Sequence, residues 1–338
     1  MRKLLAALLW FALLASVGAS QPAAAGQVVL KFSHFLGPES FFQRDFAEPL
    51  AQELETLAGG QVKVEIYNSS SPFGDVAKQA EQVEDGKIDI ALGLCSAEDD
   101  RFPRTSIIEL PFAVQDALDG SRALWGLYKD GELGDEYKDF KVLALFVHNP
   151  GLIHTTFKRI VTSDDLKDQR LRVPNKLVAG ALQALGATPV VLQANDVMAA
   201  VKDGSIDGIV TNWGNPLADF NMYMKRHTDI AFYTSAFFLV MNKSRYDGLP
   251  PDIRAVIDKI SNGPLVTQFG LLWSKWDRPV RDGASGPGQE IIVPDAALMA
   301  QWRRALRPFT EQYLDELVAG GFGDARAVYA RIAKGQAQ

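Results

Sequence analysis

Apolar residues recur at two spacings in the first part of this chain. They occupy every second position from Val62 to Ile66, which predicts a strand, and every third or fourth position from Phe42 to Leu57, which predicts an amphipathic helix. The same reading gives strands at 27–32 and 88–94 and a short helix at 75–84. This β-α-β-α-β order predicts a mostly parallel sheet that is covered by helices on both faces.

The rest of the chain continues this alternation. The strand predicted at 142–147 is broken by His148-Asn149-Pro150-Gly151, a natural crossing point between two halves of a molecule. Further strands are expected at 171–173, 188–192, 206–210, 237–241 and 290–293, with helices at 176–185, 196–202, 251–260, 263–276 and from 295 onward. We therefore expect an α/β fold throughout.

One seven-residue pattern occurs twice. Val83–Asp89 reads VEDGKID and Val201–Asp207 reads VKDGSID. Each copy closes a predicted helix and opens a strand, and its glycine can take the left-handed conformation that ends a helix. Asp-Gly is a common helix stop, so two unrelated turns would give the same pattern. Taken as a true repeat, it predicts two α/β lobes of similar construction.

The N-terminal residues predict an export signal. Two basic residues precede an uncharged apolar run from Leu4 to Val17, and Ala23-Ala24-Ala25 offers a cleavage site before Gly26. The run is shorter than the roughly 20 residues that a membrane-spanning helix needs. We expect residues 1–25 to be removed as a signal peptide and the protein to be periplasmic.

The composition of the remaining chain narrows the class of protein. Its 313 residues are enough for two domains, and losing Arg2 and Lys3 takes the formal charge from −6 to −8. There is no basic run, so nucleic acid is not an expected partner. The only cysteine is Cys95, which excludes an intramolecular disulfide.

Signatures of catalysis and of metal binding are missing from the sequence. The four histidines lack metal-ligand spacing, and there is no CxxC pair, no GxSxG elbow and no glycine-rich phosphate loop. We therefore expect no metal and no cofactor, and we expect that the protein is not an enzyme.

Arg172 is the strongest candidate for ligand binding. If Leu171 and Val173 point into a lobe, Arg172 points to the other face, at the carboxyl end of a short strand. Ligands of open α/β sheets bind at the carboxyl ends of strands. A guanidinium there can hold a carboxylate through two parallel hydrogen bonds. The alternative is a surface arginine that is paired with an acid.

The residues around Arg172 resemble a known family signature. The segment Asp164–Asn175, DDLKDQRLRVPN, is similar to that of solute-binding proteins of tripartite ATP-independent periplasmic (TRAP) transporters, of the dicarboxylate type. Matching segments follow in order at 185–190, 206–208 and 238–243, and in the first half at 30–33, 73–74, 86–89 and 110–112. The resemblance therefore spans nearly all of the chain after the signal peptide.

The resemblance implies a two-lobed fold like that of periplasmic binding proteins, in which each lobe is a mostly parallel sheet flanked by helices. We expect 26–149 plus 237–280 to form lobe I and 150–236 plus 281–338 to form lobe II, with a ligand cleft between them. The implied function is a passive carrier that captures a small organic acid and delivers it to an integral membrane permease. Crossings near Pro150 and Ala236 are expected to act as the hinge.

The resemblance also implies site residues. The carboxylate-binding arginine of the family falls on Arg172, its polar second-lobe contact on Thr211 or Asn212, and an aromatic contact on Trp213. Where some members have a second arginine, this chain has Ile153 and His154. Three further candidates are Trp213, Phe237 and His154, and each also fits a structural role. Trp213 and Phe237 could form an apolar wall of the site or belong to the core. His154 could be structural or, when protonated, could pair with a second carboxylate.

Two other functions fit the same sequence features. The protein could bind its ligand for a periplasmic signalling receptor, or it could be a periplasmic enzyme on the same scaffold. With one strong cation in the cleft, we expect monocarboxylates to bind more tightly than dicarboxylates at pH 8, because a second buried charge would lack a partner. Protonation of His154 would improve dicarboxylate binding toward pH 6.

Overall fold

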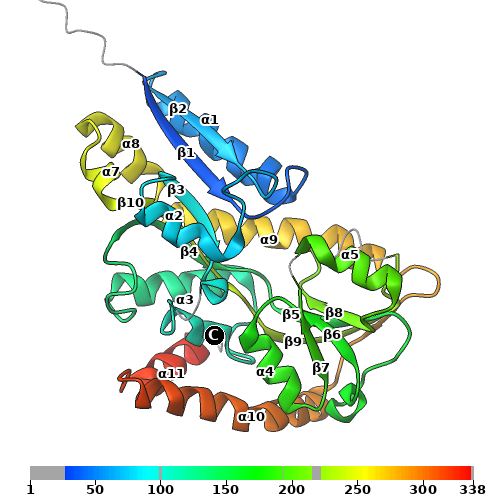
Figure 1. Ribbon diagram of the computed structural model, residues 1–338. Coiled ribbons are helices and arrows are strands. Elements are labelled where there is room, and N and C mark those ends of the chain that lie inside the picture. Colours follow the sequence, from blue (N-terminus) through cyan, green and yellow to red (C-terminus); the bar gives the residue numbers. More distant parts are fainter. Residues whose placement is uncertain (1–26, 99–100, 193, 215–221, 336–338) are drawn as a thin grey trace, which may run out of the picture.

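The structure is a computed structural model that describes residues 27–98, 101–192, 194–214 and 222–335 (Figure 1). The predicted signal peptide lies outside the described residues. Among the helices that are described, none is both long enough and apolar enough to span a membrane.

The first lobe is built on a five-stranded sheet with the order β2-β1-β3-β10-β4. Its strands are β1 (Val28–His34), β2 (Val62–Tyr67), β3 (Ile90–Leu94), β4 (Phe140–Val147) and β10 (Ala236–Asn242). One face is covered by α1 (Glu48–Leu57), α8 (Pro251–Ile260) and α9 (Gly263–Gly283), and the other by α2 (Gln79–Glu84) and α3 (Ala117–Lys129). A short helix, α7 (Lys243–Asp247), follows β10.

The second lobe is built on a six-stranded sheet with the order β11-β9-β5-β8-β6-β7. Its strands are β5 (Gly151–Thr155), β6 (Arg170–Val173), β7 (Thr188–Val191), β8 (Gly208–Thr211), β9 (Arg226–Tyr233) and β11 (Glu290–Ile292). The helix α4 (Lys176–Ala184) covers one face and α5 (Ala194–Asp203) the other.

Each sheet is mostly parallel, as predicted, and contains one reversed strand. In the first sheet β10 runs antiparallel to β3 and β4, and in the second β5 runs antiparallel to β8 and β9. Both reversed strands begin where the chain crosses from the other lobe. The chain therefore enters each lobe against the direction of its other strands, and the two crossings lie side by side.

The two crossings are fastened to each other by His148. Its carbonyl oxygen accepts a hydrogen bond from Thr234 Oγ1 at 2.6 Å, and its Nε2 accepts one from the backbone N–H of Ser235 at 3.0 Å. Gly151 leaves room for the ring of Tyr233, because a Cβ at Gly151 would lie 1.9 Å from that ring. These contacts hold the crossings as one short antiparallel ribbon, and α9 forms a third connection between the lobes (Figure 1).

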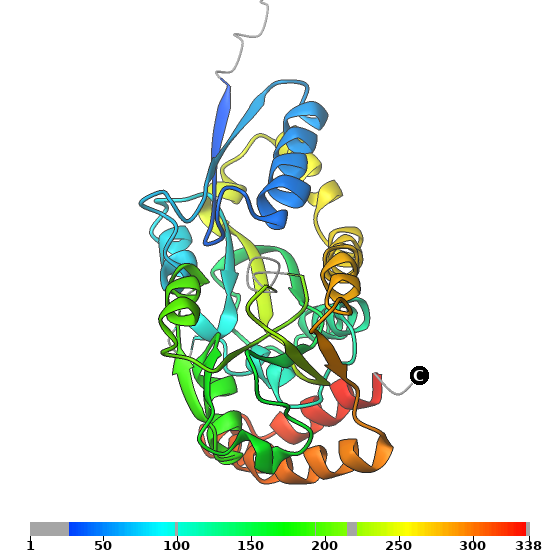
Figure 2. The ribbon, with the colours of Figure 1, turned by 90° about the vertical axis from the view of Figure 1, so that its right-hand side faces the viewer.

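The C-terminal helices do not stay on one lobe. Near its start α10 (Ala296–Ala319) packs on the second lobe through Trp302 and Leu306, whereas Leu314 and Leu317 belong to the core of the first. The last helix, α11 (Ala325–Gly335), packs against α3, at the end of the molecule opposite α1 (Figure 2). We predicted from the sequence that all of 281–338 belongs to lobe II. These contacts instead place α11 on lobe I, because its buried apolar residues pack against those of α3.

The repeated heptapeptide has the same structure in both lobes. Gly86 and Gly204 have φ angles of 67° and 72°, which are the left-handed helix ends expected from the pattern. The final aspartates also act alike: the side chain of Asp89 accepts from the N–H of Lys31, and that of Asp207 from the N–H of Arg170, both at 2.8 Å. The two copies are therefore equivalent joints of their respective sheets.

Candidate functional site

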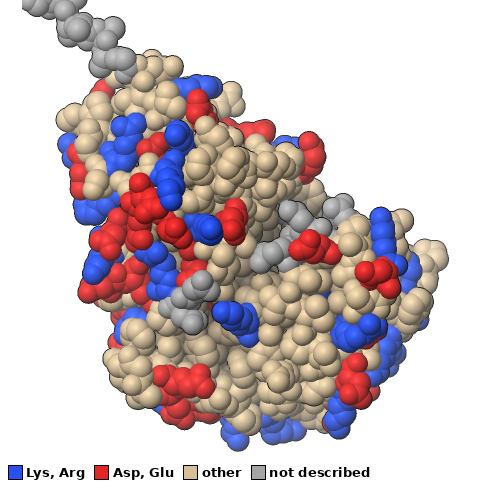
Figure 3. Space-filling model, in the orientation of Figure 1, with Lys and Arg blue, Asp and Glu red and all other residues tan. Residues whose placement is uncertain are grey.

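A cavity of about 270 Å³ lies between the lobes, where the carboxyl ends of strands from both sheets meet. Figure 3 shows the notch between the two lobes on one side of the molecule. The second lobe contributes Arg172, Pro174, Thr211, Asn212 and Tyr233 to the lining, and the first lobe and the connections contribute Phe35, Leu36, Phe42, Ser69, Gly74, Asp75, Val76, Leu94, His148, Ser235, Phe237, Trp273 and Trp276. The position is the one expected for ligands of open α/β sheets.

Arg172 lies on the cavity wall as the strand pattern predicts. Leu171 and Val173 are fully buried in the core of the second lobe, and the side chain between them points to the cavity. Its Nε donates to the carbonyl oxygen of Leu192 at 3.0 Å, which fixes the guanidinium. Arg172 is 6% exposed, and no carboxylate of the described residues lies within 4.0 Å of it. Burial lowers the pKa of Arg172 from its usual value.

This arrangement favours the binding role of Arg172 over the alternative of a surface ion pair. A buried cation without an anionic partner is costly, and an anionic ligand would supply that partner. The neighbouring Arg170 differs, because it is exposed and pairs with Asp207 at 2.6 Å.

Tyr233 stands beside Arg172 and was not anticipated from the sequence. Its hydroxyl donates to the carbonyl oxygen of Val210 at 3.3 Å. Burial raises the pKa of Tyr233, and the positive charge of Arg172 opposes part of that shift. The feature that could have identified Tyr233 is its position at the end of β9, directly before the second crossing. The tyrosine adds a polar oxygen next to the guanidinium.

Asn212 is held in the cavity wall by a buried carboxylate on α9. Asp277 Oδ1 accepts from Asn212 Nδ2 at 2.9 Å and from the N–H of Gly214 at 2.7 Å, and its Oδ2 accepts from Asn149 Nδ2 at 2.9 Å. Burial raises the pKa of Asp277 to about 6. Asp277 was not predicted from the sequence; it lies on the connecting helix α9 and joins the cavity wall to the first crossing.

His154 and Trp213 lie behind the cavity and do not line it. His154 Nδ1 is 2.8 Å from His227 Nδ1, its Nε2 contacts the carbonyl oxygen of Thr211 at 3.2 Å, and Trp213 packs edge-on against its ring. Burial, with His227 nearby, holds the pKa of His154 well below its usual value. The geometry therefore gives no support to a protonated His154 that pairs with a second carboxylate, because Nδ1 is engaged with His227 and Nε2 with the backbone of Thr211.

The first-lobe wall of the cavity is aromatic. Phe237 stacks with Phe35 and Phe146, with interplanar angles of 0° and 10°. Trp273 packs at a tilt beside Phe237, and Trp276 donates from its Nε1 to Asp45 at 2.8 Å. The predicted residues Arg172, Thr211, Asn212 and Phe237 thus meet at one cavity, and sequence reasoning missed both tryptophans because they come from the distant helix α9.

His148 adds no charge to the cavity. Its Nε2 accepts from Ser235 N–H, so its Nδ1 carries the proton and donates to the carbonyl oxygen of Asn149. Burial lowers the pKa of His148 to about 4. Among the described residues that line the cavity, the cation is Arg172 and the carboxylate is Asp75, which is exposed.

A chain of polar contacts passes behind the cavity from one lobe to the other. Asn175, at the start of α4, donates from Nδ2 to Ser96 Oγ of the first lobe at 2.8 Å. Ser96 also contacts Glu109, whose Oε1 accepts from the N–H of Ala236 at 2.7 Å. Glu109 is fully buried, and burial raises its pKa to about 8. In the described part of the chain, its Oε2 has no hydrogen-bond partner.

Comparison with protein families identifies the chain. Residues 32–316 match the model of the bacterial extracellular solute-binding proteins of family 7, the DctP family. The chain belongs to this family. Like other members, it is the solute-binding component of a TRAP transporter. Within the described residues, no cluster of three or more His, Cys, Asp or Glu side chains could hold a metal ion.

Relatives of known structure have the same fold across almost the whole chain. A TRAP solute-binding protein of an unidentified marine microbe, specific for aromatic acid ligands, is 30% identical with a TM-score of 0.86, covering 92% of this chain and 99% of its own. One from Rhodoferax ferrireducens, with copurified benzoate, is 31% identical with a TM-score of 0.85, covering 92% and 98%. A relative found by sequence comparison, the C4-dicarboxylate-binding periplasmic protein DctP of Rhodobacter capsulatus, is 24% identical over 93% of this chain and 95% of its own.

Proposed function

We propose that this family 7 protein captures a compact aromatic monocarboxylate. The observation that carries the proposal is the pairing of one guanidinium, Arg172, which has no carboxylate within 4.0 Å among the described residues, with an aromatic wall across a cavity of about 270 Å³. A guanidinium binds a carboxylate through two parallel hydrogen bonds. Phe237 and the two tryptophans then offer apolar surface to the remainder of the ligand.

The charge of the cavity supports one carboxylate and not two. A second carboxylate deep in the cavity would meet the neutral His148 and the aromatic wall, where an unpaired charge is costly. The cavity volume is also slightly below the roughly 300–1,000 Å³ of sites for drug-sized ligands, which suits a single ring. The two relatives at 30–31% identity, one described as specific for aromatic acids and one holding benzoate, support the same class.

Capture is proposed to lead to delivery. We infer that residues 1–25 direct export, that the mature chain begins at Gly26, and that the closed complex docks on the integral membrane permease of its transporter. The side-by-side crossings at His148 and Ser235 support a hinge between the lobes. Small-angle scattering is expected to show a more compact particle with ligand than without; an identical profile under saturating ligand contradicts closure.

The ligand class is tested by calorimetric titration at pH 8 with a matched pair, benzoate and terephthalate. Benzoate should bind at least tenfold more tightly, because terephthalate brings a second charge without a cation. The preference should persist at pH 6, since both nitrogens of His154 are engaged. A thermal-shift screen gives a wider survey: ligand at 100 times its Kd adds about 2.7 kcal/mol of stability. Tight, pH-independent binding of terephthalate or succinate would contradict the proposal.

A further inference from the structure

The second crossing between the lobes places alternate side chains on the cavity wall. Tyr233, Ser235 and Phe237 line the cavity, whereas Thr234 and Ala236 do not. Ala236 packs instead in the core on the other face of the first sheet. This alternation is that of an extended segment, so the side chain of Ser235 points to the same side as the rings of Tyr233 and Phe237. The serine therefore lies between the tyrosine that stands beside the guanidinium and the aromatic wall.

The hydroxyl of Ser235 is buried and is not bonded to the protein. Ser235 is 2% exposed, and its N–H is already used, because it donates to His148 Nε2 at 3.0 Å. Among the described residues, the structure shows no hydrogen bond to or from the Oγ of Ser235. A buried hydroxyl without a hydrogen bond is costly. A ligand in the cavity can supply the missing partner.

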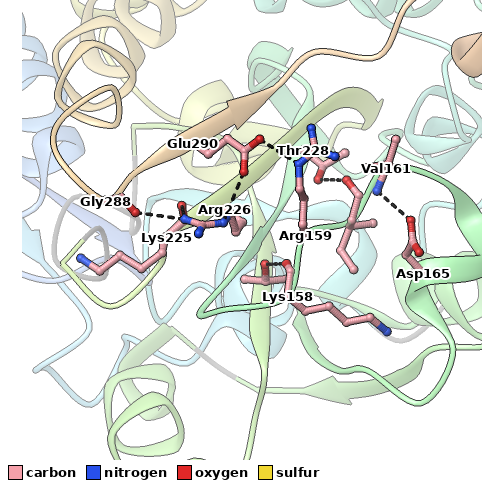
Figure 4. Close-up of polar contacts among 11 residues, drawn as sticks. Lys158, Arg159, Val161, Asp165, Lys225, Arg226, Thr228, Gly288 and Glu290 are labelled. Carbon is pink, nitrogen blue, oxygen red and sulfur yellow. Dashed lines mark hydrogen bonds and ion pairs between the residues drawn. The ribbon is translucent and has the colours of Figure 1, made fainter.

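Two other buried hydroxyls of this region are satisfied within the protein. Thr234, the neighbour of Ser235, is 1% exposed and donates to the carbonyl oxygen of His148 at 2.6 Å. In β9, Thr228 is also 1% exposed and donates to the carbonyl oxygen of Ile160 at 2.6 Å (Figure 4). These two hydroxyls hold the fold together. The contrast indicates that the hydroxyl of Ser235 serves the cavity.

Other polar side chains of the cavity wall have less need of a ligand. Asn212 Nδ2 donates to Asp277 at 2.9 Å, and both ring nitrogens of His148 are engaged. Ser69 is a second serine on the wall, but it is half-buried and therefore more accessible to water than Ser235. Water can satisfy an accessible hydroxyl. Ser235 is thus the hydroxyl of the wall with the strongest requirement for a partner on the ligand.

We propose that Ser235 determines specificity by binding a hydroxyl group of the ligand, so that the protein prefers hydroxylated aromatic monocarboxylates. The proposal rests on the proposed function, because Arg172 must hold the carboxylate. A serine hydroxyl and a ligand hydroxyl can each donate and accept, so each satisfies the other. A charged substituent fits the site less well: an ammonium group would be repelled by Arg172, and a second carboxylate would compete with the first for the same guanidinium.

The test is calorimetric titration with two matched pairs of acids, 3-hydroxybenzoate with 3-methylbenzoate and 4-hydroxybenzoate with 4-methylbenzoate. A methyl group is similar in size to a hydroxyl but forms no hydrogen bond. At least one hydroxy acid should bind the wild type more tightly than its methyl counterpart. Ser235→Ala should weaken binding of that hydroxy acid about twofold to tenfold, the range for one net hydrogen bond, and leave the methyl acid unchanged.

Matched variants separate this contact from a general effect on the cavity. Ser235→Thr keeps the hydroxyl and should keep the wild-type ratio of hydroxy-acid to methyl-acid affinity, and Ser69→Ala should keep it as well. An unchanged ratio in Ser235→Ala, or its loss in Ser69→Ala, overturns the proposal. So does a wild type that binds the methyl acids but prefers neither hydroxy acid. Failure of the wild type to bind any of the four acids would instead refute the proposed function.

Discussion

The two walls of the cavity are made in opposite ways. The second-lobe wall is mostly polar, and hydrogen bonds to its own lobe or to α9 hold its main polar side chains, as Leu192 holds Arg172 and Asp277 holds Asn212. The first-lobe wall is made of rings that pack on one another, such as Phe237 on Phe146. The difference indicates that the two walls have different roles: the polar wall fixes the carboxylate, and the aromatic wall accommodates the rest of the ligand.

The largest effect is expected from the polar wall. Arg172→Ala should lower affinity by roughly 30-fold to several thousand-fold, because it leaves the ligand charge unpaired and costs about 2–5 kcal/mol. Arg172→Lys should also weaken binding, since an ammonium cannot reproduce the planar fork. Calorimetric titration checks both, with Arg170→Ala as the matched control. If Arg172→Ala bound the ligand nearly as tightly as the wild type does, the polar wall would not be what fixes the carboxylate, and the proposed difference between the two walls would be wrong.

A smaller effect is expected from the group that positions the polar wall. Asp277→Ala removes the acceptor of three N–H donors, including Asn212 Nδ2, and should weaken ligand binding about tenfold. Asp277→Asn should cost less, because its remaining oxygen can still accept from Asn212 and Gly214. Equal affinities for the wild type and both variants would show that ligand binding does not depend on the hydrogen bond from Asn212 to Asp277.

The aromatic wall should discriminate by ligand type. Phe237→Leu keeps apolar volume but loses ring stacking, which is worth about 0.5–1.5 kcal/mol, so affinity for benzoate should fall about two- to tenfold. Affinity for an aliphatic acid such as butyrate should change less. Titration of both acids into wild type and variant measures this. The same loss for the two acids would mean that the wall serves only as apolar volume.

The smallest effect on binding, and a distinct effect on stability, is expected from Glu109. Its pKa is about 8 in the folded protein and near 4.5 when unfolded, so the unfolded chain releases this proton first. Wild-type stability should therefore decline between about pH 4.5 and pH 8, relative to Glu109→Gln, by at most about 1.4 kcal/mol per pH unit. Denaturant melts at pH 6 and pH 8 check the sign; a difference between the proteins that does not change with pH would contradict it.

The parts of the site that could be read from the sequence are those that depend on local alternation. Leu171 and Val173 are apolar on either side of Arg172, so the pattern predicted that the guanidinium lies on the opposite face from the core, and the family resemblance favoured a binding role over a surface ion pair. Tyr233, Asp277 and the two tryptophans were not predicted, because they come from β9 and α9, and only the tertiary fold brings those elements to the site.

Two missed elements have a physical explanation. β9 carries His227 and Asp229 among its apolar residues, and these polar groups obscured its alternation. α3 contains Gly120 and Gly126, which lower helix propensity. Gly120 is nevertheless required, since a Cβ there would lie 2.5 Å from Val114 and 2.7 Å from Val147. Close packing outweighs intrinsic preference at that position.

The repeated aspartate has a consequence for the ligand site that goes beyond ending a helix. Asp207 grips Arg170 twice: its carboxylate accepts the Arg170 N–H at 2.8 Å, and its own N–H donates to the Arg170 carbonyl oxygen at 2.7 Å. These two hydrogen bonds fix the register of β6 at Arg170, two residues before Arg172. A slip of one residue would turn Arg172 into the core and Leu171 into the cavity. The second copy of the heptapeptide thus sets the register of β6, and that register determines the face of the sheet on which the Arg172 guanidinium lies.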